Sequence, residues 1–202
     1  MDKIIVTIEI ALIILFPLIR FYQQSSWTYR SYILNIVLIY LIWQFSYAFL
    51  HELCHMFGSW ITGAKISDYQ LILPYWKGDF KTAYINSNFE NNYQAFVSVI
   101  LPYFRDILFS IIGFLVLKRK RIYNSFVTGL ILILFILSPL FDIANNYFAF
   151  VLGATNDFNG IAMRFGYIIT HSIGLLFTAI TTIIMLRILR IYKNYPEIVL
   201  KK

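Results

Sequence analysis

The hydrophobic pattern of this chain consists of five long apolar runs separated by shorter polar segments. A helix needs about 20 residues to cross roughly 30 Å of bilayer hydrocarbon. The first run lacks a strong basic segment before it and a small-residue cleavage site, so we expect a retained span rather than a signal peptide. The pattern predicts an all-α integral membrane fold, one polytopic membrane domain over residues 1–202. Its expected spans cover residues 3–22, 31–62, 95–117, 123–152 and 165–192.

The segment between the second and third runs, residues 63–92, is polar enough to lie outside the hydrocarbon. Two stretches in it, KISDYQLIL and DFKTAYI, alternate between apolar and polar positions, and Pro74 and Gly78 lie between them. Alternation with a period of two favours strands, and proline and glycine favour a turn. We therefore expect either a small extramembrane hairpin or an interfacial loop between helices 2 and 3.

Composition supports a membrane protein. Hydrophobic residues make up 59% of the chain and charged residues 13%, whereas soluble domains average about a quarter charged. The net charge is +7, but lysine and arginine gather at the ends of the apolar runs, where they set orientation. We therefore expect no nucleic-acid partner. The single cysteine, Cys54, leaves no internal disulfide.

Orientation follows from the basic residues in short loops, which favour the cytoplasmic side. The run KRKR at residues 118–121 places the third-to-fourth loop inside. Alternation of the spans then puts the N-terminus outside and the C-terminal RILRIYK inside. A chain rich in Ile, Asn and Lys is typical of a low-GC bacterium, so the expected location is a bacterial cell membrane. The oligomeric state is left open.

The stretch FLHELCHMF, residues 49–57, places three ionisable side chains inside the second run. Such residues cost on the order of 2.5 to 3.5 kcal/mol at the bilayer centre, so they usually serve a function. His51, Glu52 and His55 form the pattern HExxH. Positions i and i+4 share one helix face, so both imidazoles can bind one metal ion while the glutamate acts as general base. We expect a Zn²⁺ site with ligands His51 and His55 and with Glu52 as the catalytic residue.

A catalytic zinc site usually takes three protein ligands. Asp142 lies at a depth similar to that of His51, because both come about 20 residues into runs of the same direction, at about 1.5 Å per residue. Asp157 would lie roughly 20 Å further out on a continuing helix, unless the turn-rich GATNDFNG folds back. His171 enters the fifth run from outside and also competes. Asp142 is the preferred third ligand and Asp157 its alternative.

Three further residues lie around Asp142. Asn145 and Asn146 follow it by three and four residues and share its helix face. We expect their amides to bind the substrate or to orient the ligand carboxylate, with interhelical hydrogen bonding as the alternative. Pro139 frees a backbone carbonyl and is expected to bend the helix near the metal.

The run HELCHMFGSWITGAKI resembles the second-helix signature of site-2-protease-like intramembrane zinc metalloproteases, with Gly58, Gly63 and Ala64 at the positions expected after HExxH. SPLFD looks like the later motif of that family, in which a proline precedes a zinc-ligating aspartate. VILPYF has a weaker similarity to a proline-containing segment on the helix between the two motifs. Ile143 stands where the family usually has glycine. The resemblance implies a zinc metalloendopeptidase that hydrolyses peptide bonds of membrane-embedded or membrane-proximal substrates.

Two other functions fit the same residues. A catalytically inactive zinc-binding membrane protein, acting as a partner or chaperone, would use the histidines without the glutamate. A proton or metal-ion transporter would use the intramembrane ionisable residues as a path. Five spans without an internal repeat argue mildly against a secondary transporter. In every case the expected partners are the lipid bilayer and a membrane protein or peptide.

Overall fold

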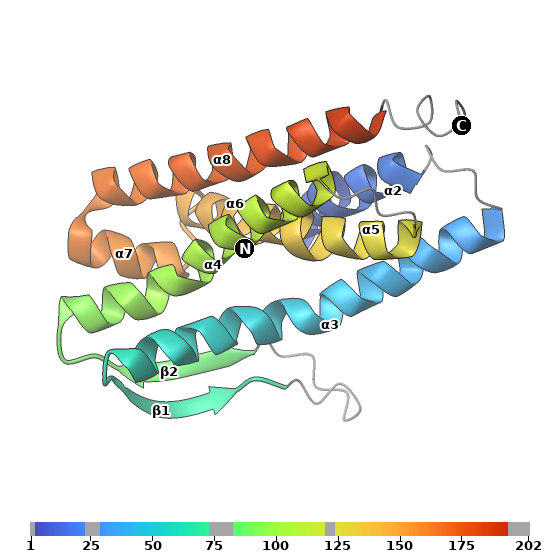
Figure 1. Cartoon of the computed structure of the whole chain (residues 1–202). Helices are drawn as coiled ribbons and strands as arrows, with labels where there is room; N and C mark the ends of the chain where they lie inside the picture. Colours follow the sequence, from blue (N-terminus) through green and yellow to red (C-terminus); the bar gives the residue numbers. More distant parts are fainter. Residues whose placement is uncertain (1–2, 23–28, 73–82, 120–123, 194–202) are drawn as a thin grey trace.

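The structure is a computed structural model of the whole chain and describes residues 3–22, 29–72, 83–119 and 124–193. Helices dominate these residues and one two-stranded sheet accompanies them (Figure 1). Five helical segments are long and apolar enough to cross a membrane, which confirms the expected helical architecture. They are Ile4–Tyr22, Arg30–Ile61, Asn92–Arg119, Ser125–Val151 and Tyr167–Ile191.

Two of the five spans change their helical geometry in the middle. The first span consists of α1 (Lys3–Glu9), the π-helical η1 (Ile10–Leu15) and α2 (Phe16–Tyr22). The fourth consists of α5 (Ser125–Leu132), the π-helical η3 (Ile133–Leu137) and α6 (Ser138–Val151). Each π-helical turn precedes a proline by two residues, Pro17 and Pro139. A proline ring clashes with the carbonyl four residues earlier, and the wider π turn makes room for it.

The other helices are α3 (Tyr29–Ile61), α4 (Asn92–Arg119), α7 (Asp157–Phe165) and α8 (Tyr167–Lys193). The HExxH pattern lies in the last third of α3. That helix ends at Ile61, and Gly63 in the following turn has a φ of 74°, which glycine adopts at little steric cost. The backbone N–H of Ala64 then donates to the carbonyl of Ser59 at 2.9 Å and closes the helix end.

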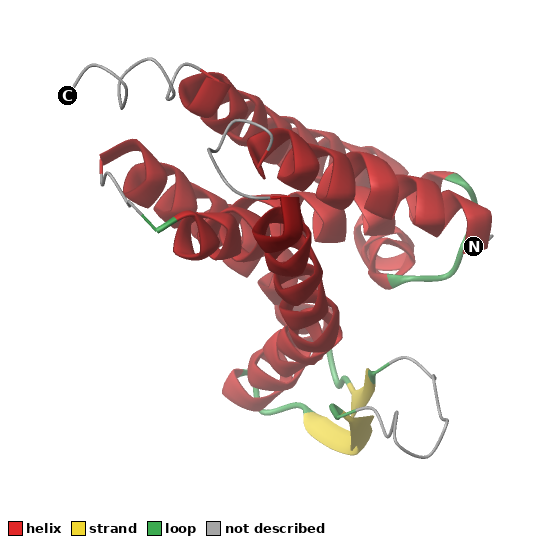
Figure 2. Ribbon diagram, turned by 90° about the vertical axis from the view of Figure 1, so that its right-hand side faces the viewer, coloured by secondary structure: helices red, strands yellow, loops and turns green. Residues whose placement is uncertain are grey.

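The segment after α3 forms an antiparallel pair of strands, β1 (Lys65–Gln70) and β2 (Tyr84–Asn88). The pairing runs from Lys65 opposite Asn88 to Gln70 opposite Tyr84, so two paired strands are present as expected. The second strand begins at Tyr84, near the end of the stretch DFKTAYI. Pro74 and Gly78 lie outside the described residues. The hydroxyls of Ser59 and Ser87 are 2.9 Å apart and connect the sheet to α3 at the edge of the bundle (Figure 2).

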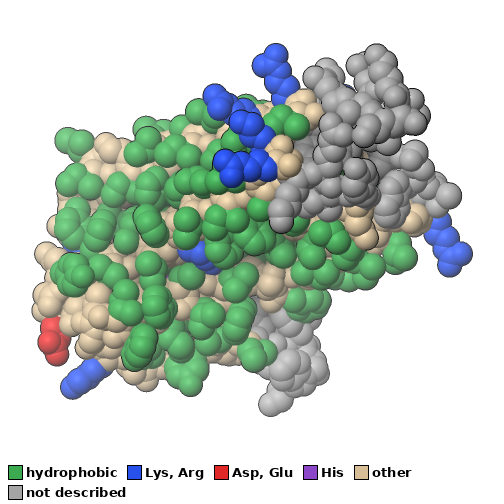
Figure 3. All heavy atoms as spheres, in the orientation of Figure 1, with side chains coloured by type: hydrophobic (Ala, Val, Ile, Leu, Met, Phe, Trp, Pro, Cys, Tyr) green, Lys and Arg blue, Asp and Glu red, His purple; other side chains and the backbone are tan. Residues whose placement is uncertain are grey.

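The fourth span is the central helix of the bundle. In its most apolar 18-residue window 61% of the residues are buried, against 17 to 28% in the other four spans. Its buried side chains join two apolar clusters, one around Trp43 and Phe141 and the other around Tyr147 and Phe158. The other spans surround it and expose apolar side chains, which cover much of the surface in Figure 3. Asp142 on α6 therefore lies in the interior.

Helices α3 and α4 approach each other closely at Gly58. A Cβ atom on this residue would lie 2.7 Å from the Cα of Ser98 and 3.1 Å from the carbonyl oxygen of Val97. Only the absence of a side chain lets the two backbones come this close. One turn before Gly58, the Nδ1 of His55 reaches the carbonyl of Ser98 at 2.8 Å. The glycine thus determines how a histidine of the HExxH pattern meets the neighbouring helix.

We expect Gly58→Ala to destabilise the protein by about 1 to 3 kcal/mol, the usual cost of overpacking, although alanine is intrinsically the better helix former. The matched control is Gly160→Ala in α7, where the nearest atom would lie 3.7 Å from the new Cβ, and this variant should be neutral or slightly more stable. Thermal unfolding in detergent, followed by circular dichroism, measures both. Equal melting temperatures for Gly58→Ala and the wild type would contradict the close approach.

Candidate metal centre

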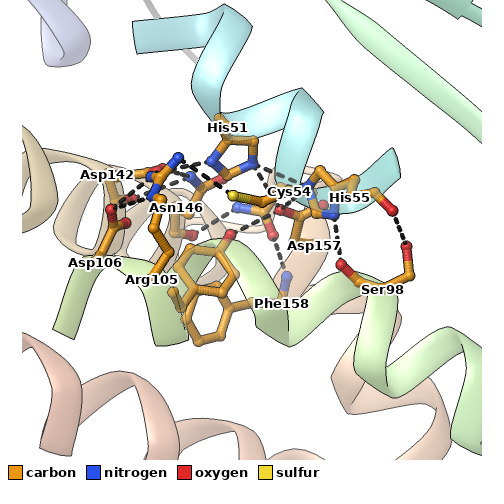
Figure 4. Close-up of polar contacts among 12 residues, drawn as sticks. His51, Cys54, His55, Ser98, Arg105, Asp106, Asp142, Asn146, Asp157 and Phe158 are labelled. Atoms are coloured by element: carbon orange, nitrogen blue, oxygen red, sulfur yellow. Dashed lines mark hydrogen bonds and ion pairs between the residues drawn. The ribbon is translucent and has the colours of Figure 1, made fainter. Parts of the chain in front are cut away.

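Three side-chain atoms from two distant parts of the chain converge on one point (Figure 4). The Nε2 atoms of His51 and His55 are 3.0 Å apart, and the Oδ2 of Asp157 lies 3.2 and 3.1 Å from them. Tetrahedral zinc with ligand distances of about 2.0 to 2.2 Å separates its ligand atoms by about 3.3 Å. The observed triangle is close to that size, so the three residues fit a metal ion.

The outer ring nitrogens of both histidines carry protons, so in the neutral imidazoles all three converging atoms are acceptors. The Nδ1 of His55 lies 2.8 Å from the carbonyl oxygen of Ser98, which can only accept, so this nitrogen carries the proton. The Nδ1 of His51 lies 2.7 Å from the carboxylate of Asp142 and donates to it in the same way. In the neutral imidazoles both Nε2 atoms then present lone pairs. Two lone pairs and a carboxylate facing one another are unfavourable unless a cation lies between them.

The spacing of four residues in the HExxH pattern places both histidines on one face of α3, as expected. His51 and His55 are both buried on one face of α3, with ring centroids 4.7 Å apart. Glu52 follows His51 and is half-buried. Among the described residues its carboxylate has no hydrogen-bond partner, so it is free to take part in proton transfer. Cys54 is turned towards another helix, with its Sγ 3.8 Å from the guanidinium of Arg105.

Asp157 reaches the site because the chain folds back after α6. Gly153, with a φ of 82°, begins this turn, and the side chain of Asn156 caps the start of α7. The Nδ2 of Asn156 also donates to the carbonyl oxygen of Asn146 at 2.6 Å, which holds the turn against α6. Asp157 is the first residue of α7 and accepts a hydrogen bond from Tyr103 at 2.8 Å. The alternative third ligand thus lies beside both Nε2 atoms.

The charge of Asp157 suits a ligand. Burial raises the pKa of this carboxyl, but the positive charge and hydrogen bonds of His55 and His51 in their protonated form outweigh burial and hold the pKa well below its usual range. A metal cation in place of those protons would act in the same direction. Its place at the N-terminus of α7 also favours a negative charge. Asp157 is therefore a carboxylate at neutral pH.

Asp142, the preferred third ligand, lies at the depth expected for it but on the other side of His51. Its Oδ2 contacts Nδ1 of that ring, away from the point where the Nε2 atoms meet. The same Oδ2 accepts from Arg105 at 3.0 Å, and Oδ1 accepts from Tyr47 at 3.1 Å and from Asn146 at 3.0 Å. Such a carboxylate fixes the tautomer and the orientation of a ligand histidine.

The other residues predicted for the site are Asn145, Asn146 and His171, and their positions differ. Asn146 donates to the carboxylate of Asp142, which agrees with an orienting role. The Oδ1 of Asn145 is buried and has no hydrogen-bond partner in the described part of the chain, and a role in binding substrate stays a prediction for both amides. His171 lies elsewhere, with its Nδ1 3.1 Å from the hydroxyl of Tyr147.

A charged pair on α4, Arg105 and Asp106, supports the site although no sequence motif pointed to it. The guanidinium of Arg105 bridges the buried carboxylates of Asp106, at 3.0 Å from Nε, and Asp142. Two ionisable residues within the third apolar run were the available signal. In the ranges that the structure describes, Arg105 is the one guanidinium or ammonium paired with the carboxylates near the site. It pairs with Asp106 and Asp142 but not with Asp157, so a cation held by the two histidines would offset the negative charge of Asp157.

Comparison with protein-family models, with curated proteins and with solved structures found no match. The similarity of HELCHMFGSWITGAKI to site-2-protease-like enzymes therefore stays a prediction from the motif. What supports a function is the arrangement of His51, His55 and Asp157 and of the residues that hold them.

The two aspartates should differ in their effect on metal binding. We expect Asp157→Ala to abolish binding of one zinc ion per chain, because it removes a ligand atom. Asp142→Asn should weaken binding about 10- to 100-fold, as usual for an outer partner of a ligand histidine. The control is Asp68→Asn on the exposed strand β1. Elemental mass spectrometry and competition titration in detergent measure the effect. Loss of zinc in the Asp142 variant alone would contradict this order.

Metal binding should also depend on pH with a definite sign. The metal and protons compete for the same two Nε2 atoms, so affinity falls as the pH drops and the imidazoles become protonated. Zinc should be retained at pH 7.5 and released progressively below about pH 6. Equilibrium dialysis across this range checks the prediction. Affinity that rises on acidification would exclude the two imidazoles as ligands.

Proposed function

We propose that the protein is a zinc metalloendopeptidase that cleaves membrane-embedded or membrane-proximal polypeptides. The observation that supports this most strongly is the convergence of three acceptor atoms beside Glu52, which lies between the two histidines in α3. Two imidazoles and one carboxylate are a ligand set typical of catalytic zinc, which leaves a fourth position open.

A zinc ion at this place would supply a Lewis acid and lower the pKa of a water molecule to about 7. Glu52 accepts a proton from the attacking water and delivers it to the nitrogen of the leaving amine. Its half-buried carboxylate, with no hydrogen-bond partner among the described residues, suits both transfers. Asp142 holds the proton on Nδ1 of His51, and the Ser98 carbonyl does the same for His55, so both rings keep their lone pairs directed at the centre.

Substrates must be extended at the cleaved bond, because an intact helix keeps its carbonyls hydrogen-bonded. The sheet of β1 and β2 lies beside the end of α3 that carries the histidines (Figure 1). Short exposed strands can add a further strand from a peptide, with main-chain hydrogen bonds providing the affinity. We propose that the sheet presents extended substrate to the centre in this way.

A transporter is the second candidate, because the ionisable side chains form a connected series. Polar contacts link Asp106 through Arg105 and Asp142 to His51, and from there to Asp157. A fixed guanidinium within such a series opposes the passage of cations. An inactive zinc-binding protein would in turn have no use for Glu52. Measuring peptide cleavage and ion flux with the Glu52→Gln variant distinguishes both alternatives from a protease.

We also propose a topology with the N-terminus outside and the C-terminus in the cytoplasm of a bacterial cell. The last turn of α4 carries Lys118 and Arg119, and the last turns of α8 carry Arg187 and Arg190. Basic residues at the ends of spans favour the cytoplasmic side. The metal centre then lies nearer the outer face, on the side of the β1–β2 sheet.

Glu52→Gln should lower peptide cleavage by about 10²- to 10⁴-fold, the usual contribution of a general base, and leave zinc content unchanged. Glu90→Gln, an exposed residue just before α4, is the matched control. The assay uses proteoliposomes with zinc-loaded protein, fluorescent casein and a set of labelled single-span membrane proteins. Equal cleavage by wild type and Glu52→Gln would refute the assignment. Zinc-dependent ion flux without cleavage by the wild type would favour the transporter.

A further inference from the structure

A cavity of about 390 Å³ lies between α4 and α8, at the opposite end of these helices from the metal centre. Its lining residues are Phe114, Lys118, Arg187, Arg190 and Ile191. Pockets for small ligands usually measure about 300 to 1,000 Å³. None of these residues belongs to the group of His51, His55 and Asp157, so the cavity is a separate feature of the fold.

The side chains that line the cavity combine positive charge with an apolar wall. Three are cationic and two are apolar, and the Nζ of Lys118 lies 5.6 Å from the ring centroid of Phe114. In the part of the chain that the structure describes, no salt bridge pairs Lys118, Arg187 or Arg190 with a carboxylate. Like charges around one cavity repel each other, and a bound anion would relieve that repulsion.

Helical spacing brings these residues together. Phe114 and Lys118 are four residues apart on α4, and Arg187 and Ile191 are four residues apart on α8, so each pair occupies one helix face. Leu117 and Ile188 are buried in the apolar core between the same helices, which keeps the two faces adjacent. The buried pair thus holds α4 and α8 together beneath an open cavity, around which the side chains of Lys118, Arg187 and Arg190 are exposed.

The position along the helices indicates which kind of anion the cavity would suit. The apolar spans of α4 and α8 end at Arg119 and Ile191, beside the cavity, so it lies at the boundary of the hydrocarbon layer. Lysine and arginine side chains gather over α8 next to an apolar surface in Figure 3. Lipid phosphates lie at this level, and basic pockets between spans on the cytoplasmic side are suited to anionic headgroups.

We propose that this cavity is a binding site for an anionic phospholipid. The guanidinium groups of Arg187 and Arg190 take the phosphate, since arginine matches phosphate oxygens with two parallel hydrogen bonds. Lys118 adds a third positive charge, and Phe114 and Ile191 contact the glycerol and the first part of an acyl chain. A free phosphate ion would use the cations but gain nothing from the apolar wall.

The test is native mass spectrometry of the full chain in detergent with phosphatidylglycerol, phosphatidylcholine or inorganic phosphate as the probe. The wild type should prefer phosphatidylglycerol over phosphatidylcholine, and Arg187→Gln/Arg190→Gln should lose roughly 20- to 30-fold of that affinity. Arg187→Lys/Arg190→Lys keeps the charge but loses the paired hydrogen bonds, so it should bind phosphatidylglycerol less tightly than the wild type and more tightly than the Gln variant. Arg20→Gln/Arg30→Gln removes the same charge at the same end of the bundle but outside the cavity, and should bind like the wild type.

Three results would overturn the proposal. The first is equal affinity of the wild type for the two lipids, and the second is an equal loss in the Arg20/Arg30 control, which would indicate general surface charge. The third is displacement of phosphatidylglycerol by equimolar inorganic phosphate, which would assign the cavity to a free anion. Unchanged zinc content and melting temperature in each variant show that the fold is intact, so the outcome is independent of the proposed proteolysis.

Discussion

The hydrogen bond between Nδ1 of His51 and the carboxylate of Asp142 is the contact on which the rest of the site depends. It joins α3 to the central helix α6 and decides which nitrogen of the imidazole keeps a lone pair. Asp142 is itself held by Tyr47, Asn146 and Arg105, so each of its oxygens has more than one partner. A buried carboxylate is tolerated only with such compensation. The candidate metal centre therefore depends on a network of buried polar side chains around Asp142, on the side of His51 that faces away from the centre.

The bundle places this network by burying one span among four others. Because α6 is enclosed, Asp142 meets partners on both sides, His51 from α3 and Arg105 from α4. The close approach of α3 and α4 at Gly58 brings the Ser98 carbonyl to His55. Each histidine thus depends on a different neighbouring helix, and the two rings are set independently although they belong to the same face of α3.

The sequence predicted the site as far as local geometry reaches. Helical periodicity was sufficient for His51 and His55, and counting residues placed Asp142 at the right depth. Depth does not determine which side of an imidazole a carboxylate meets, however, because that depends on how α3 and α6 are rotated against each other. Asp157 needed the fold-back through Gly153 and Asn156, a tertiary feature that the turn-rich GATNDFNG allowed but did not require. Tyr103 had no local pattern pointing to the centre, and the signal for Arg105 was its charge within an apolar run.

The π-helical turn before Pro139 has a consequence for the phase of the fourth span. A π turn accommodates one extra residue, so side chains after it are rotated by about 100° relative to a continuous α-helix. The part before the turn and the part after it can thus direct different faces to the interior. One half is free to satisfy apolar packing around Leu132 and Ile136, while the other directs Asp142 towards His51. The fourth span therefore consists of two helical segments on one axis, and each segment directs a different face to the interior.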